Sequence, residues 1–187
     1  MKRRRVTVVI GAALVATALA PASASAEERT CRGSLGGVTV DNLRVPQEAT
    51  CTLTGTRVQG TIKVERAATL SARGVRVIGN VQGENARRVD VIRSSRIGGS
   101  VQVKQGAAAR VLDSYVNADI QYDANRAALG ASRNVVGGSV QVFQNTGGVA
   151  LFGNTIDGNL QCKENRPAPT GGGNVVQGNK EDQCARL

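Results

Sequence analysis

Pairs made of a small polar residue and a following aliphatic residue recur along this chain at nearly constant spacing. The pairs are Asn42-Leu43, Thr61-Ile62, Asn80-Val81, Ser100-Val101, Asp119-Ile120, Ser139-Val140 and Asn159-Leu160, and successive pairs lie 19 or 20 residues apart. A repeat of about 20 residues without a helical pattern between the marks is typical of a solenoid whose coils stack on one another.

Further apolar residues keep a fixed distance from each aliphatic mark. Two positions after the marks are Val45, Val64, Gly83, Val103, Tyr122, Val142 and Cys162; four positions before them are Val58, Val77, Ile97, Val116, Val136 and Ile156. This alternation predicts strands with one inward face, and a third apolar group (Leu53, Ala72, Val111, Ala131, Leu151) predicts a third strand in each coil. The hexapeptide rhythm of left-handed coils is absent, and parallel crossovers are strongly biased to the right hand. We therefore expect an all-β, single-domain, right-handed parallel β-helix of about seven coils.

Glycine and small polar residues mark the expected bends. The pairs are Gly60-Thr61, Gly79-Asn80, Gly99-Ser100, Gly138-Ser139, Gly158-Asn159 and Gly178-Asn179. Glycine is conformationally permissive, and the neighbouring polar side chain can bond the main chain. Asn134, Asn154 and Asn174 recur at 20-residue steps, and stacked amides can hydrogen-bond along the coil axis. We interpret both columns as structural bends.

The first 26 residues have the pattern of a signal peptide. A basic start at residues 2–5 precedes the apolar run 6–20, and Ala24-Ser25-Ala26 fits a signal-peptidase site. Four of the 24 Lys and Arg lie in this segment, so residues 27–187 carry 20 against 14 acidic residues, a net charge of about +6. No later apolar stretch approaches the roughly 20 residues of a membrane helix. We expect a secreted or wall-associated domain at 27–187, with no membrane span after signal removal.

The four cysteines form two pairs whose spacing matches one coil. Cys31 and Cys51 lie 20 residues apart, and Cys162 and Cys184 lie 22 apart, which predicts one disulfide at each end of the solenoid. Lys180 and Asp182 replace the apolar residues of earlier coils, as a terminal repeat does to stop further stacking. A metal site needs four convergent thiolates or added histidine, and the chain has no His. We expect no bound metal and no cofactor.

The C-terminal segments 158–162, 166–174 and 178–184 carry a resemblance to a known group of proteins. With the rest of the repeat, they are similar to the small secreted β-helical repeat proteins of high-GC Gram-positive bacteria. This resemblance implies fold and export, but no reaction and no catalytic residues. The bactofilins are similar in solenoid shape alone. The export signal, the paired end cysteines and the polar last coil depart from them and argue against end-to-end polymerisation.

Two outward columns are candidates for binding. Arg57, Arg76 and Arg96 are expected in one column, continued by Tyr115, Val135, Thr155 and Val175, while Arg73 and Arg93 are expected in another. Such a ridge suits an anionic polymer such as wall teichoic acid; the alternative is a solvated face. Gln82, Gln102, Gln121, Gln141 and Gln161 follow Lys63 in an amide ladder that either bonds sugar hydroxyls or satisfies itself. No aromatic residues interleave with these arginines, so we expect no nucleic-acid partner.

The residues give little support for catalysis. Glycoside chemistry needs two carboxyls held about 5 to 10 Å apart, but the acids Asp113, Asp119, Asp123 and Asp157 are scattered, and no long insertion forms a cleft. Nucleophilic triads lack a histidine. We predict a non-enzymatic structural or binding protein with no catalytic residues. The alternatives are a small glycan-active lyase or hydrolase and a self-assembling surface scaffold. The oligomeric state stays open.

Overall fold

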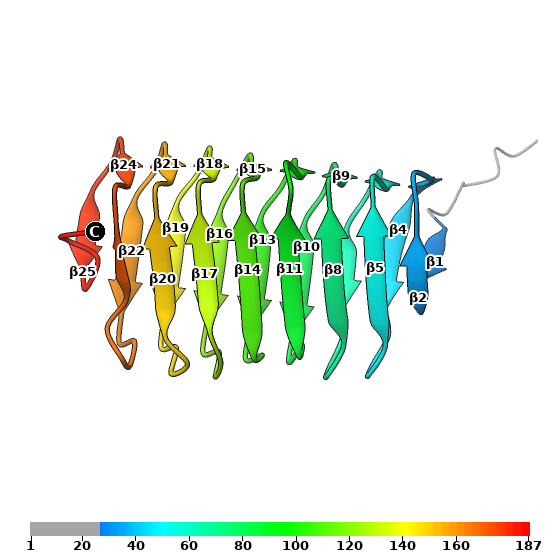
Figure 1. Cartoon of the computed structure of the whole chain (residues 1–187), viewed down its shortest axis with the longest axis horizontal. Helices are drawn as coiled ribbons and strands as arrows, with labels where there is room; N and C mark the ends of the chain where they lie inside the picture. The colour runs from blue at the N-terminus through cyan, green and yellow to red at the C-terminus, as the bar shows by residue number, and fades with distance from the viewer. Residues whose placement is uncertain (1–26) are drawn as a thin grey trace, which may run out of the picture.

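The computed structural model describes residues 27–187, and the predicted signal peptide lies outside them. The described chain is a parallel β-solenoid of about eight turns, one more than expected, and it contains no helix. In Figure 1 the strands of the near face point up, those of the far face point down, and the chain advances from right to left. The winding is therefore right-handed, and the predicted fold class is confirmed.

Three sheets run the length of the solenoid, and all their strand pairs are parallel. Sheet A holds β1 (Glu28–Thr30), β4 (Asn42–Val45), β7 (Ile62–Val64), β10 (Val81–Glu84), β13 (Val101–Lys104), β16 (Ile120–Asp123), β19 (Val140–Phe143), β22 (Leu160–Lys163) and β25 (Lys180–Asp182). Sheet B holds β2 (Gly33–Leu35), β5 (Thr50–Thr54), β8 (Thr69–Arg73), β11 (Arg88–Ile92), β14 (Ala108–Leu112), β17 (Leu129–Ser132), β20 (Val149–Phe152) and β23 (Thr170–Gly172). Sheet C, with two residues per strand, holds β3 (Thr39–Val40), β6 (Arg57–Val58), β9 (Arg76–Val77), β12 (Arg96–Ile97), β15 (Tyr115–Val116), β18 (Val135–Val136), β21 (Thr155–Ile156) and β24 (Val175–Val176).

The core is a narrow stack of aliphatic layers, one from each turn. The four predicted inward columns are buried, because alternate residues of every strand point into the solenoid. Gly83 and Tyr122 are the two extremes of one column. A Cβ at Gly83 would lie 2.8 Å from Cγ2 of Val89 across the core, so that layer has no room for a larger residue. The Tyr122 ring is fully buried, and its hydroxyl donates a 2.9 Å hydrogen bond to the Gly130 carbonyl on sheet B.

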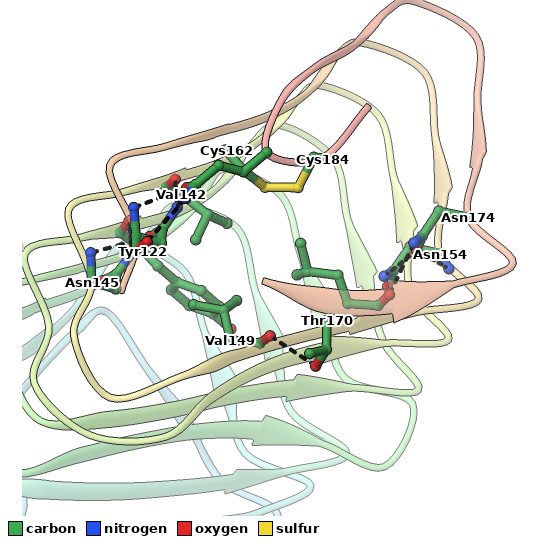
Figure 2. Close-up of a disulfide and its surroundings, with 12 residues drawn as sticks. Tyr122, Val142, Asn145, Val149, Asn154, Cys162, Thr170, Asn174 and Cys184 are labelled. Carbon is green, nitrogen blue, oxygen red and sulfur yellow. Dashed lines mark hydrogen bonds between the residues drawn. A yellow bond between two sulfur atoms is a disulfide. The ribbon is translucent and has the colours of Figure 1, made fainter. Parts of the chain in front are cut away.

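The predicted polar bends form continuous hydrogen-bond ladders. At the entry to sheet A, each side-chain oxygen accepts from the backbone amide of the next turn, from Asn42 through to Asn179, at 2.8 to 3.2 Å. The Asn134, Asn154 and Asn174 column is a second ladder, with the hydrogen bonds along the axis that its spacing suggested, and it is buried. A third ladder, Asn125–Asn145–Asn165, was not predicted, although its members also recur every 20 residues; it ends on Gln183. Figure 2 shows Asn154 and Asn174 stacked in one column and Asn145 in another.

Both predicted disulfides are present, one in each terminal region. The Cα atoms lie 5.7 Å apart in Cys31–Cys51 and 5.2 Å apart in Cys162–Cys184, which is shown in Figure 2. The strand register aligns Cys51 with Gly33 and Cys162 with Asp182, so each bond joins cysteines that are two positions out of register. Two such bonds are consistent with an extracellular, oxidising environment.

The polar last coil also has the predicted register. Strand β25 places Lys180 beside Leu160 and Asp182 beside Cys162. Lys180 and Asp182 are exposed, whereas Leu160 and Cys162 are fully buried. The aliphatic stack therefore ends at β22, one turn before the end of sheet A.

Candidate functional site

The outward residues of sheet C form a single column that changes character along the solenoid. The register confirms the predicted order Arg57, Arg76, Arg96, Tyr115, Val135, Thr155 and Val175. In each of these strands the first residue points outward, and every member of this sheet C column is exposed. Neighbouring strands lie about 4.8 Å apart, and like charges at that spacing repel. The column is therefore basic over three turns and mostly apolar over the next four.

Arg73 and Arg93 do not share a column, contrary to the prediction. The strand register aligns Arg73 with Thr54 below and Ile92 above. The turn that contains Arg93 has one extra residue at the corner between sheets B and C. Positive φ angles occur there at both Arg93 (61°) and Ser94 (58°), whereas the preceding turn uses Gly74 alone (58°). Both arginines are exposed at this corner, one position out of line.

The five predicted arginines are gathered along one edge of the solenoid, and they lack acidic partners. Within residues 27–187, none of Arg57, Arg73, Arg76, Arg93 and Arg96 lies within 4.0 Å of a carboxylate oxygen. By contrast, ion pairs engage Arg44, Arg88, Arg110 and Arg133. Of the five, Arg73 donates a 3.1 Å hydrogen bond to the Ser71 hydroxyl. We call these five residues the basic ridge; its positive charge is not neutralised by the protein itself.

The predicted glutamine column lies on the outer face of sheet A, in register from Lys63 to Gln161. Side-chain amides donate from Gln82 to Gln102 at 3.2 Å, from Gln102 to Gln121 at 3.0 Å and from Gln141 to Gln161 at 3.3 Å. The amide of Gln161 then donates to the Glu181 carboxylate at 2.7 Å. Among the steps between glutamines in the part of the chain that the structure describes, only the one from Gln121 to Gln141 has no such bond. These bonds favour the interpretation of a ladder that satisfies itself.

The acids considered for catalysis do not converge. Asp119 directly precedes β16 and Asp123 ends it, a separation of about 13 Å between backbone positions. The Asp119 carboxylate accepts a 2.8 Å hydrogen bond from the Ser139 amide, which identifies it as a member of the bend ladder. Asp113 pairs with Arg133 across one turn at 2.9 Å. The Arg133 guanidinium lowers the pKa of the Asp113 carboxyl through this hydrogen bond.

The structure reveals one charged cluster that the sequence analysis missed. Asp90, on the outer face of sheet B, is only 6% exposed. Its carboxylate accepts hydrogen bonds from Arg88 at 2.8 Å and from Arg110 of the next turn at 2.9 and 3.2 Å. Burial raises the pKa of Asp90, but the bonds from the two guanidinium groups outweigh it and the net shift is downward. The sequence does carry a signal for this pair: Asp90 and Arg110 are 20 residues apart, which is one turn of the solenoid.

Residues 27–187 hold no group of three or more His, Cys, Asp or Glu side chains placed to bind a metal ion. The same residues include no helix with the length and apolar character needed to cross a bilayer.

Comparison of the chain with protein-family models, with curated proteins and with solved structures finds no match. The β-solenoid fold is established by the structure itself, and no family or homologue is identified.

Proposed function

We propose that the protein is a secreted, non-enzymatic binding module that attaches to anionic polymers of the cell envelope through the basic ridge. The observation that carries this proposal is the concentration of five exposed arginines without acidic partners at one edge of the solenoid. A polyanion would neutralise the repulsion within the ridge and release its own counterions, and both effects favour binding.

The rigidity of the fold supports this assignment. The column positions are set by backbone hydrogen bonds between turns, so Arg57, Arg76 and Arg96 are held in a line before any ligand binds. Pre-organisation lowers the cost of ordering a binding surface. The two disulfides and the predicted signal peptide agree with a location outside the cell, where such polymers occur.

The test is co-sedimentation of the protein with purified cell walls that carry teichoic acid, at low and high salt. We expect binding at about 50 mM salt that is lost at about 500 mM, because exchange of counterions makes the affinity salt-dependent. The variant with Arg57→Gln, Arg76→Gln and Arg96→Gln should bind about 100-fold more weakly, at roughly 1 kcal/mol for each cation at an anionic surface.

The matched control changes three exposed arginines at the opposite corner of the solenoid, where sheets A and B meet. Arg66→Gln, Arg87→Gln and Arg126→Gln remove the same net charge, and in the described structure these residues also form no ion pair. Equal loss of binding in the two triple variants would reduce the effect to net charge and contradict a specific site. Binding that is absent from the wild type, or unchanged by salt, would end the proposal.

A further inference from the structure

The point at which the sheet C column changes from basic to apolar lies between Arg96 and Tyr115, which are adjacent in register. Tyr115 is 41% exposed although large aromatic side chains are scarce in this chain, which has two Tyr, two Phe and no Trp. Its hydroxyl donates a 3.2 Å hydrogen bond to the Asn117 side chain, which holds the ring in one orientation on the surface. An aromatic ring is therefore presented beside the last arginine of the ridge.

Two shallow hollows flank this junction. One, of about 370 Å³, is lined by Arg76, Arg96, Ile78, Tyr115 and Asn117. Ile78 is 60% exposed, so this hollow combines two unpaired guanidinium groups with two apolar side chains. This hollow therefore offers charged and apolar contacts close enough together to reach one small ring of a ligand.

The second hollow, also about 370 Å³, lies on the other side of the same two residues. Its lining includes Arg96, Tyr115, Arg133, Asp113 and Val135. The Arg133 guanidinium is already paired with Asp113, and Val135 is 49% exposed. In this column the unpaired arginines therefore end at Arg96. Beyond it, the hollow combines the apolar surfaces of Tyr115 and Val135 with serine hydroxyls and an ion pair whose charges compensate each other.

This arrangement distinguishes between classes of polyanion. A polyphosphate has charge but no apolar face, so it would gain from the arginines and not from Tyr115. A polysaccharide with acidic sugars carries a carboxylate beside the C–H face of each ring, and such a face packs against aromatic side chains. Neighbouring turns lie about 4.8 Å apart, close to the length of one hexopyranose unit, so successive units can meet successive turns.

We propose that the Arg96–Tyr115 junction is a subsite for an acidic polysaccharide, with Arg76 and Arg96 binding sugar carboxylates and Tyr115 stacking on a neighbouring sugar ring. Arginine suits this role because its planar guanidinium forms paired hydrogen bonds with carboxylates. The inference rests on the proposed function, since it names the polymer that the basic ridge selects.

The experiment compares the binding of polygalacturonate and of long-chain polyphosphate by isothermal titration calorimetry at about 50 mM salt. The decisive variant is Tyr115→Val, which places in this position the residue that follows in the same column at Val135. We expect this variant to lose about 3- to 10-fold in affinity for polygalacturonate, the range measured for pairs of aromatic rings. Its affinity for polyphosphate should change by less than twofold.

Tyrosine fluorescence provides a second readout. The two tyrosines are Tyr115 and the fully buried Tyr122, so a change on adding polygalacturonate that disappears in Tyr115→Val reports on the surface ring. Equal losses for both polymers in Tyr115→Val, or no loss for either, would overturn the acidic-polysaccharide subsite while leaving the basic ridge intact. Undiminished binding of both polymers by the Arg57, Arg76 and Arg96 triple variant would instead refute the proposed function.

Discussion

At the scale of single residues, Asp90 shows how a surface position becomes structural. Its carboxylate sits under two arginines, one two positions earlier on β11 and one in the next turn. Hydrogen bonds to charged groups contribute more than neutral ones, and removing one member leaves the others without compensation. The cluster links two neighbouring turns on the outer face of sheet B, away from the aliphatic core.

Asp90→Asn should lower the free energy of unfolding at pH 7 by about 1 to 3 kcal/mol, because the two guanidinium groups lose their counter-ion. The folded-state pKa of Asp90 lies below its ordinary value, so its contribution is fully present above the unfolded pKa of about 3.9 and is lost as the pH falls through the folded pKa. Thermal unfolding followed by circular dichroism between pH 7 and pH 2 checks both points.

The difference in stability between wild type and Asp90→Asn should therefore shrink as the solution becomes more acidic than about pH 4. Asp113→Asn is the matched control, since Asp113 also pairs with an arginine one turn away but is exposed. Solvent screens that pair, and the control should have a smaller effect. A constant difference across the whole pH range would show that Asp90 acts through its shape and not through its charge.

At the scale of elements, the asparagine and glutamine ladders both place one amide in each turn, about every 20 residues, but they differ in burial. The Asn134–Asn154–Asn174 ladder is buried between sheets B and C, whereas the glutamine ladder lies half-buried on the outer face of sheet A. The amide of Asn154 donates both to Asn174 at 2.9 Å and to the Ala131 carbonyl at 2.8 Å. Its oxygen accepts from the Asn134 amide and backbone N–H.

Asn154→Ala should destabilise the protein by about 3 kcal/mol or more, because it leaves several buried donors and acceptors without partners. Gln141→Ala removes one amide from the half-buried glutamine ladder and should cost less than about 1 kcal/mol, since water reaches this face and replaces the lost partner. Urea unfolding of both variants makes the comparison. Equal costs would contradict the view that burial, and not stacking, gives the asparagine ladder its importance.

At the scale of the whole molecule, both ends of the solenoid place a cation in the same inward column. This is the column of aliphatic marks in sheet A. By strand register it begins with Arg29, which lies beside Leu43, and ends with Lys180, which lies beside Leu160. If one molecule stacked on another in register, Lys180 would lie about 4.8 Å from Arg29 with little water between them. This repulsion, together with the disulfide at each end, opposes growth into a fibre.

We expect the wild-type protein to show no end-to-end association, and the double variant Arg29→Leu, Lys180→Leu to associate, because it continues the aliphatic column at both ends. Light scattering coupled to size-exclusion chromatography measures the difference. Either single variant should give an intermediate result, since one cation remains at every junction. A double variant that stays monomeric would show that the repulsion is not what isolates the ends.

The sequence alone determined the period, the inward columns, the bend ladder and both disulfides. In a parallel solenoid, residues one period apart in sequence are neighbours in space, so contacts such as Leu43 on Ile62 are visible as spacing. The buried face also appears as an alternation of apolar residues, since a strand turns each successive side chain to the other face.

The tertiary structure decided what depends on the path of the corners and on side-chain partners. The extra residue beside Arg93 displaced it from the Arg73 column because two successive positive φ angles widen that turn. The pairing of Asp90 with Arg110, and the absence of such a pair at Arg96 within residues 27–187, followed from side-chain placement and not from spacing. A repeat specifies which residues stack, but only three-dimensional packing specifies which charges are compensated and which remain free to bind.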